Sequence, residues 1–458
     1  MLAFLLTPGW AAAPIALILF GSVSFFSPFA ALLSLLGALP LHFLFRKPFG
    51  PVDLSLVEVM LPAVIVGLLG AAYWRALVEK PGASVRGLRP LLRSPYAPPF
   101  LLLVVLASAS VVLLMPRTDE GFRVGLRQYS LIVEPIVVYI LVRTTLANGR
   151  LRLWVALDVL LLGAAVVAGY GLIETIWYTV SPPPNVGGYH RVQSMFNHPN
   201  TLGLYLSRMI PLFGTLGLIL PGGRRRRVYI GVTLVLGVIA LLSGSRGAWM
   251  ALAAAAFVVA VLTGRFRWLL PAGGLGLLGL GGLILSGQNR LMNVFQPGRG
   301  SGDTRRRLWR AAADEIQNSP MWGAGLGDVR WMRRYIPARR LQGTELVDAH
   351  NLFLDFWSKL GFIGLALMLW LLARYYQLSW RVYRRSDPTY RAIGVALIAT
   401  MTAAFFHGMI DAFYFGLQLA MLFWFLLGVA ELLNSQPTDE PSSVENVENA
   451  PPAAASTG

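Results

Sequence analysis

Long apolar runs recur from one end of this 458-residue chain to the other. Most of them are roughly 17 to 25 residues long, which lets each cross about 30 Å of hydrocarbon as a helix. Only 13% of the residues are charged and 55% are hydrophobic, which excludes an ordinary soluble fold. The short alternating segments of a membrane barrel are absent. The sequence therefore predicts an all-α, polytopic membrane protein.

Hydropathy predicts about 12 or 13 transmembrane helices. They lie near residues 10–26, 28–45, 55–75, 97–116, 124–143, 151–179, 199–220, 228–243, 247–263, 268–286, 353–374, 390–410 and 413–433. We expect a single transmembrane domain over residues 1–433. Residues 434–458 are rich in Pro, Ser, Glu and Ala without an apolar period, so they are expected to form a disordered cytoplasmic tail.

The short basic loops predict the orientation of the chain, because arginine holds such loops on the cytoplasmic side. Arginines at 224–227, 265–267 and 374–385 are separated by even numbers of predicted spans, so one orientation puts all of them inside. The loops around residues 191–198 and 287–352 then lie on the extracytoplasmic face. The basic residues 46–47 would fall outside, which leaves the orientation of the first two or three spans open.

The one large loop is unusually rich in arginine. Between residues 288 and 352 there are eleven arginines and six acidic residues. Long translocated loops tolerate positive charge, but guanidinium groups also bind phosphate through paired hydrogen bonds. The other basic residues are scattered over short loops, so no nucleic-acid partner is expected. The chain has no cysteine, which excludes disulfides and thiolate chemistry.

The large loop ends in a histidine at the start of an apolar run. His350 would lie at a membrane–water boundary, where an imidazole can accept a proton from a hydroxyl near neutral pH. Asp348 or Asp355 could orient its ring. The alternative is a histidine that only marks the interface.

A short amphipathic helix is expected within the same loop, over residues 304–318. Its expected apolar face is formed by Trp309, Ala312, Ala313 and Ile316. Arg305 lies one turn before Trp309, and Asp303 is a candidate N-cap. Such a helix would rest on the membrane surface and hold Arg305 at headgroup depth. The glycine-rich residues 320–327 are expected to form a tight connector.

A second polar cluster precedes another predicted span. Pro199 suits the first position of a helix, with Asn197 or His198 as the cap, and Arg191 lies just before them. His198 is a second histidine on the same expected face, so it could compete with His350 for the role of a base.

Arg208 lies nine residues beyond Pro199, which places it roughly 13 Å along the helix. A charge at that depth is costly unless it is paired or faces an aqueous cavity. Glu134 and Glu174 are candidate partners, so a purely structural ion pair is the alternative to a role in binding.

The break between two further spans carries Arg246. Small residues around it, Ser243, Gly244, Ser245 and Gly247, let helices approach closely. A helix start with free backbone N–H groups and an arginine is suited to holding a phosphate. No group of residues with the spacing of metal ligands is evident, so no metal is expected.

These pieces occur in a particular order. The order is Asn197-His198-Pro199-Asn200, then Ser245-Arg246-Gly247-Ala248-Trp249, then Arg305 four residues before Trp309, then residues 320–327, then His350-Asn351 and Lys359-Leu360-Gly361. Ordered in this way, they resemble the O-antigen ligase and O-antigen polymerase superfamily of bacterial membrane glycosyltransferases. The similarity runs from about residue 95 to residue 430.

The resemblance implies a fold similar to C-type glycosyltransferases and an active site on the periplasmic face of the bacterial inner membrane. It implies transfer of a glycan, with inversion and without a metal or cofactor, from an undecaprenyl diphosphate carrier. The acceptor hydroxyl would belong to lipid A core, a growing polysaccharide or a protein. By this resemblance Arg246 and Arg305 hold the diphosphate, His350 is the catalytic base, and Arg191 and Arg208 are further phosphate contacts.

The alternative is a transporter or flippase for lipid-linked glycans, which would also place arginines in an aqueous cavity. Transporters tend to carry inverted repeats and helices broken at the midplane. Here the marked residues gather at one expected face and in one long loop, which favours the enzyme. Ligase and polymerase activities are not distinguished by the sequence.

Overall fold

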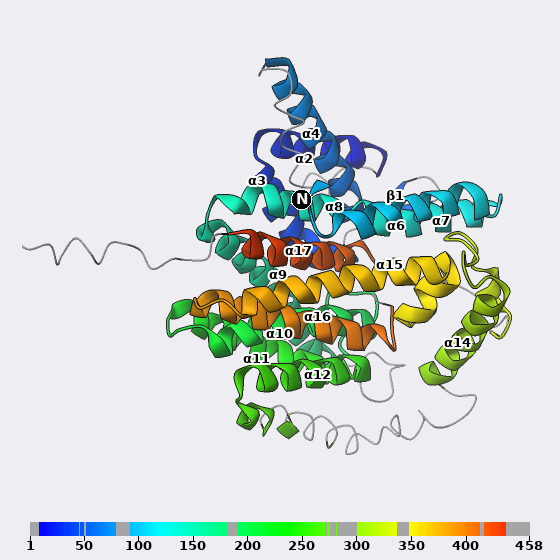
Figure 1. Ribbon diagram of the computed structural model, residues 1–458. Coiled ribbons are helices and arrows are strands. Elements are labelled where there is room, and N and C mark those ends of the chain that lie inside the picture. Colours follow the sequence, from blue (N-terminus) through cyan, green and yellow to red (C-terminus); the bar gives the residue numbers. More distant parts are fainter. Residues whose placement is uncertain are drawn as a thin grey trace, which may run out of the picture.

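The computed structural model describes residues 9–44, 46–49, 52–78, 92–181, 190–270, 273–274, 281, 300–336, 348–412 and 416–436. The regular secondary structure of these parts is almost entirely helical. The exception is a short antiparallel hairpin, β1 (Arg46–Phe49) and β2 (Val52–Ser55). Most of the long helices lie side by side in a bundle, and α14 lies across one end of it (Figure 1).

Nine helices in the described residues are long and apolar enough to cross a membrane. They are α4 (Leu56–Val78), α6 with η2 (Ala97–Leu114), α7 with α8 (Asp119–Thr145), α9 (Arg150–Val180), α10 (Pro199–Ile219), α12 (Arg246–Thr263), α15 (Leu352–Tyr383), α16 (Pro388–Gly408) and α17 (Leu417–Ser435). Each overlaps a predicted span. The all-α, polytopic architecture expected from the sequence is therefore confirmed.

Three further helices overlap the remaining predicted spans within the described residues. They are α2 (Gly9–Phe26), α3 (Pro28–Ala38) and α11 (Arg224–Leu242). Four arginines open α11, which explains its weaker hydropathy. Most of the predicted span at residues 268–286 and most of the expected tail lie outside the described residues.

The most deeply buried helix is α17, with every residue from 417 to 433 buried. A helix that is hydrophobic on all sides belongs in the interior of a bundle. Trp424 packs edge-on against Phe100 of α6 and Tyr139 of α8. In Figure 1 α17 lies between α15 and the N-terminal helices. It therefore forms the core against which the flanking helices pack.

Helix α15 is broken at Gly361, whose φ of 70° lies in a region that favours glycine. The glycine-rich residues 320–327 pack against this break. The amide of Gly325 donates to the carbonyl of Lys359 at 3.0 Å, and a Cβ on Gly361 would overlap the carbonyl oxygen of Met321. The segment expected as a tight connector thus fixes the outer part of α15.

Helix α14 (Gly300–Asn318) packs on a small core at the end of the bundle. Its buried residues Leu308, Ala311 and Ala312 meet Trp331 and Ala349. The helix therefore rests on other parts of the protein, which hold it in place.

The expected apolar face of α14 was wrong in two respects. Ala313 is exposed, whereas Leu308 and Ala311 are fully buried. Contact with the small core selects the buried face, and the sequence alone could not show where that core lies. Asp303 was also wrong as an N-cap, because the helix already begins at Gly300. It lies in the first turn and pairs with Arg306 and Arg307.

Candidate active site

One end of the bundle brings together four segments that are distant in sequence. These are residues 190–198, 243–246, 348–351 and 409–412. Arg191 donates to the carbonyl oxygen of Ser243 at 2.8 Å. The side-chain amide of Asn351 donates to the carbonyl oxygen of Met409 at 2.7 Å. Helix α14 adds its first turns to this end.

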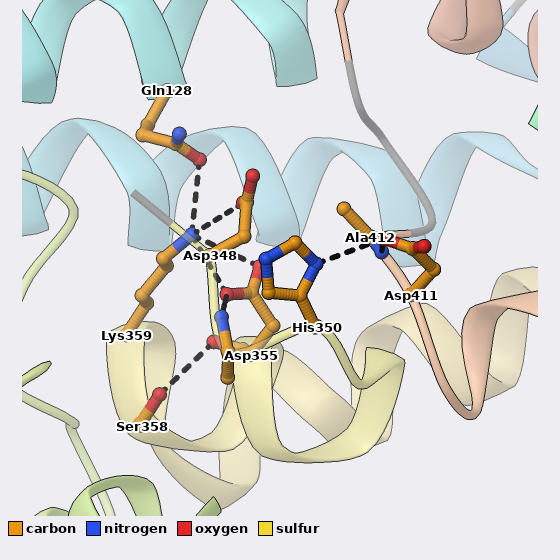
Figure 2. A network of polar contacts seen from close by, with 9 residues as sticks. Gln128, Asp348, His350, Asp355, Ser358, Lys359, Asp411 and Ala412 are labelled. Carbon is orange, nitrogen blue, oxygen red and sulfur yellow. Dashed lines mark hydrogen bonds and ion pairs between the residues drawn. The ribbon is translucent and has the colours of Figure 1, made fainter. Parts of the chain in front are cut away.

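The centre of this arrangement is a histidine–carboxylate pair. His350 Nδ1 lies 2.8 Å from Asp411 Oδ1, and the amide of Ala412 donates to the same oxygen at 2.9 Å (Figure 2). Burial alone would raise the pKa of Asp411. The hydrogen bond and charge of His350, with the charge of Arg305, instead hold that pKa well below its usual range. Asp411 is thus a carboxylate at neutral pH.

His350 is held in an unusual backbone conformation, with a φ of 51°. Such values are uncommon for residues other than glycine and often mark functional sites. With Nδ1 bonded to a carboxylate, the neutral ring carries its proton on Nδ1 and keeps the lone pair on Nε2. Burial lowers the pKa of His350, but the hydrogen bond and charge of Asp411 outweigh it, so the net shift is upward.

Arg305 binds the other oxygen of the same carboxylate, with a terminal nitrogen 2.8 Å from Asp411 Oδ2. Its buried Nε has no hydrogen-bond partner among the described residues. Arg306 and Arg307, next in sequence, pair with Asp303. Of the three consecutive arginines, the one selected by its spacing to Trp309 is the one that reaches Asp411.

His198 caps α10, as expected. Its Nδ1 accepts the amide of Asn200 at 3.0 Å, and Pro199 is the first helical residue. A terminal nitrogen of Arg191 donates to Asn200 Oδ1 at 2.8 Å. Burial, followed by the charge of Arg191, lowers the pKa of His198. The charge of Asp411 raises this pKa but does not outweigh them. Both histidines therefore belong to one electrostatic environment, with opposite pKa shifts.

Arg246 is the first residue of α12, which begins one residue before the predicted span, so this arginine lies at a helix start as expected. The next residue, Gly247, packs against the end of α16. A Cβ on Gly247 would lie 3.2 Å from the side chain of Ile410, the residue before Asp411. The start of α12 thus adjoins the segment that carries Asp411.

Arg208 is buried within α10, where it donates to the carbonyl oxygen of Leu204 at 2.6 Å. One of its two expected partners has a different function. Glu174 lies 2.7 Å from His190 Nε2 and accepts the amide of Ser194 at 2.6 Å. Glu174 therefore fixes the loop after α9.

Neither Asp348 nor Asp355 hydrogen-bonds to His350, so the expectation that one of them orients the ring was wrong. Both bind Lys359 instead: its Nζ lies 3.2 Å from Asp348 Oδ1 and 2.9 Å from Asp355 (Figure 2). Gln128 of α7 accepts a third hydrogen bond from this ammonium at 3.2 Å. A buried cation between two carboxylates explains why neither is available to the histidine.

The chain is fixed on both sides of His350, on one side by a carboxylate of the same cluster. The amide of Ala349 donates to Asp355 Oδ1 at 2.9 Å. On the other side, Asn351 caps α15 by accepting the amides of Phe353 and Leu354. The unusual backbone of His350 is thus held between two anchored neighbours.

Sequence reasoning missed Asp411. The only signal was an acidic residue between two predicted spans, at residues 390–410 and 413–433, on the face expected to be extracytoplasmic. Among the described residues, no group of three or more His, Asp or Glu side chains could hold a metal ion.

Part of the chain matches a known protein family. Residues 230–369 match the family model described as O-antigen ligase. The matched region contains Arg246, Arg305 and His350, whereas Asp411, Arg191 and Arg208 lie outside it. No curated protein matches the chain.

Proposed function

Because this chain belongs to the O-antigen ligase and O-antigen polymerase superfamily, we propose that it moves a glycan from an undecaprenyl diphosphate carrier to an acceptor hydroxyl. The transfer inverts the anomeric carbon and needs no metal. It takes place at the extracytoplasmic face of the bacterial inner membrane. The acceptor is a glycan, lipid A core or protein. The observation that carries this proposal is that Asp411 binds both His350 and Arg305.

The two arginines stabilise the leaving group in this proposal. Negative charge grows on the diphosphate as its bond to the sugar breaks, and guanidinium groups placed there stabilise the transition state. Arg305 is held by Asp411 and keeps a buried donor, while Arg246 stands at a helix start beside the same segment. Arg191 and Arg208 are further phosphate contacts.

His350 is the base. Its Nε2 takes the proton of the acceptor hydroxyl while the hydroxyl oxygen attacks the anomeric carbon. The bond from that carbon to the diphosphate oxygen breaks, and its electron pair leaves with the diphosphate. Asp411 fixes the tautomer of His350 and stabilises the imidazolium that forms. Attack opposite to the leaving group inverts the anomeric carbon in this proposal.

The proposed reaction assigns a role to the transmembrane helices and to the large loop. We propose that residues 1–433 form one transmembrane domain and that residues 287–352 are its extracytoplasmic catalytic loop. A transporter for lipid-linked glycans is disfavoured, because moving a substrate across the membrane requires no base held against a carboxylate.

Transfer from a synthetic undecaprenyl diphosphate glycan to an acceptor, with purified protein, tests the proposal. His350→Ala is expected to lose transfer while donor binding persists. His198→Ala is the matched control, a histidine at the same end of the bundle, and is expected to retain most activity. Unchanged transfer by His350→Ala would defeat the proposal, and loss confined to His198→Ala would move the base to His198.

A further inference from the structure

The end of the bundle opposite the candidate active site carries a groove between α9 and α11. Its volume is about 550 Å³. The walls are largely apolar and the mouth is polar. The lining residues are Leu161, Leu162, Ala165, Val228, Val232, Asp158, Arg224, Arg225 and Tyr229. We call this the α9/α11 groove.

The mouth of the groove is arranged to attract an anion. Asp158 is already engaged, because a terminal nitrogen of Arg225 lies 2.9 Å from its Oδ2 and the hydroxyl of Tyr229 donates to its Oδ1 at 2.9 Å. The guanidinium of Arg225 also lies over the ring of Trp154, at 4.8 Å. These contacts neutralise the only acidic residue in the lining and hold Arg225 in place.

The other arginine of the lining is differently placed. Arg224 is exposed and makes no ion pair with the residues that the structure describes. It opens a run of four arginines, residues 224–227, at the first turn of α11. Basic residues beside apolar transmembrane walls are the chemistry that recognises anionic lipid headgroups.

We propose that the α9/α11 groove binds one anionic glycerophospholipid, with its phosphate on Arg224 and an acyl chain along the apolar walls. Leu162 and Val228 are well exposed, so the groove opens toward the hydrocarbon of the membrane. A free phosphate ion would gain nothing from these walls. A zwitterionic headgroup would need an acceptor for its ammonium, and Asp158 is engaged by Arg225 and Tyr229.

Native mass spectrometry of the full chain in detergent tests the headgroup part of the proposal, with phosphatidylglycerol, phosphatidylethanolamine and phosphatidylcholine as probes. We expect one phosphatidylglycerol to bind in preference to the other two. Arg224→Gln should weaken this binding by about fivefold. The matched control is Arg384→Gln, which removes an exposed arginine at the same end of the bundle, outside the groove. Equal weakening by both variants would indicate diffuse surface charge and overturn the proposal, as would equal binding of the three lipids.

A second pair of variants tests the acyl-chain part. Ala165→Phe fills the groove, whereas Val166→Phe places the same ring on the neighbouring, lipid-exposed position of α9. Only Ala165→Phe is expected to lose the bound phosphatidylglycerol, with both variants unfolding at the wild-type temperature. Retention of the lipid by Ala165→Phe would overturn the proposal. Competition by soluble glycerophosphate as effective as that by phosphatidylglycerol would also overturn it, because it would show an anion site without a lipid.

Discussion

His350 and Asp411 are 61 positions apart in the chain, yet Nδ1 of the histidine lies 2.8 Å from Oδ1 of the carboxylate. The contact joins the start of α15 to the segment that follows α16. It also links the histidine to Arg305, which binds the second oxygen of Asp411. A change at this carboxylate should therefore affect both the proposed base and the proposed diphosphate contact.

The pH dependence of transfer follows from this contact. A general base must be neutral, so activity is lost as the pH falls through the pKa of His350. That pKa is raised, because Asp411 outweighs the effect of burial, so the acid limb should lie above the ordinary histidine value of about 6.5. The pH–rate profile of glycan transfer at saturating donor measures it.

Asp411→Asn removes the two largest interactions that raise the pKa of His350. Burial and Arg305, which lower this pKa, remain, together with the smaller raising effect of Asp348. The acid limb should move to lower pH. Transfer should also fall by about 10²- to 10⁴-fold, since the ring loses its orientation and the imidazolium its counter-charge. An acid limb that stays in place would show that Asp411 does not act through His350.

Arg305→Gln should lower the rate of transfer by about 10²- to 10³-fold, because one donor to the leaving diphosphate is lost. Arg306→Gln is the control: it removes the same charge from the next residue, whose partner is Asp303 at 3.6 Å. The control should stay within about twofold of wild type, because Asp303 keeps its shorter ion pair with Arg307. Steady-state kinetics with varied donor distinguishes the two variants, and equal losses would argue against a specific role for Arg305.

Lys359→Met should destabilise the protein by about 3–5 kcal/mol, because Asp348 and Asp355 would then be left largely buried without a counter-charge. Adding Asp348→Asn and Asp355→Asn to this variant should restore most of the stability. Thermal unfolding in detergent measures both effects. A single variant as stable as wild type would mean that the cluster contributes little to holding the segment before His350.

Gly361→Ala should cost about 1–3 kcal/mol from backbone conformation alone, and more from overlap with the carbonyl of Met321. Gly169→Ala is the matched control within a transmembrane helix. A Cβ there meets nothing within 4 Å, so this change should be neutral or slightly stabilising. The two unfolding temperatures, compared with wild type, check the prediction; equal shifts would contradict it.

Features set by local sequence were predictable. The helix starts at Pro199 and Arg246 and the cap at His198 follow from residues that suit the first turn of a helix or interrupt an apolar run. The spans were predictable as well, because hydropathy depends only on the local sequence. The choice of Arg305 over its two neighbours came from one spacing within a helix.

Features set by packing between distant segments were not predictable. Asp411 carries no local motif, and its importance depends on the folding of α14, α15 and α16 against one another. The buried face of α14 depends on a small core that includes Trp331 and Ala349, residues outside that helix. In the same way, the sequence marked Lys359 only as part of an ordered motif, and gave no sign that it binds the two carboxylates that seemed available to His350.

The break at Gly361 separates the outer turns of α15 from the part that lies deeper in the bundle. Helices commonly adjust their tilt when bilayer thickness changes. Since residues 320–327 fix the outer turns through backbone hydrogen bonds, we expect His350 to keep its contact with Asp411 when the deeper part changes its tilt. Transfer rates in vesicles of short-chain and long-chain lipids should therefore differ little, and the protein should tolerate hydrophobic mismatch without loss of its proton-accepting geometry.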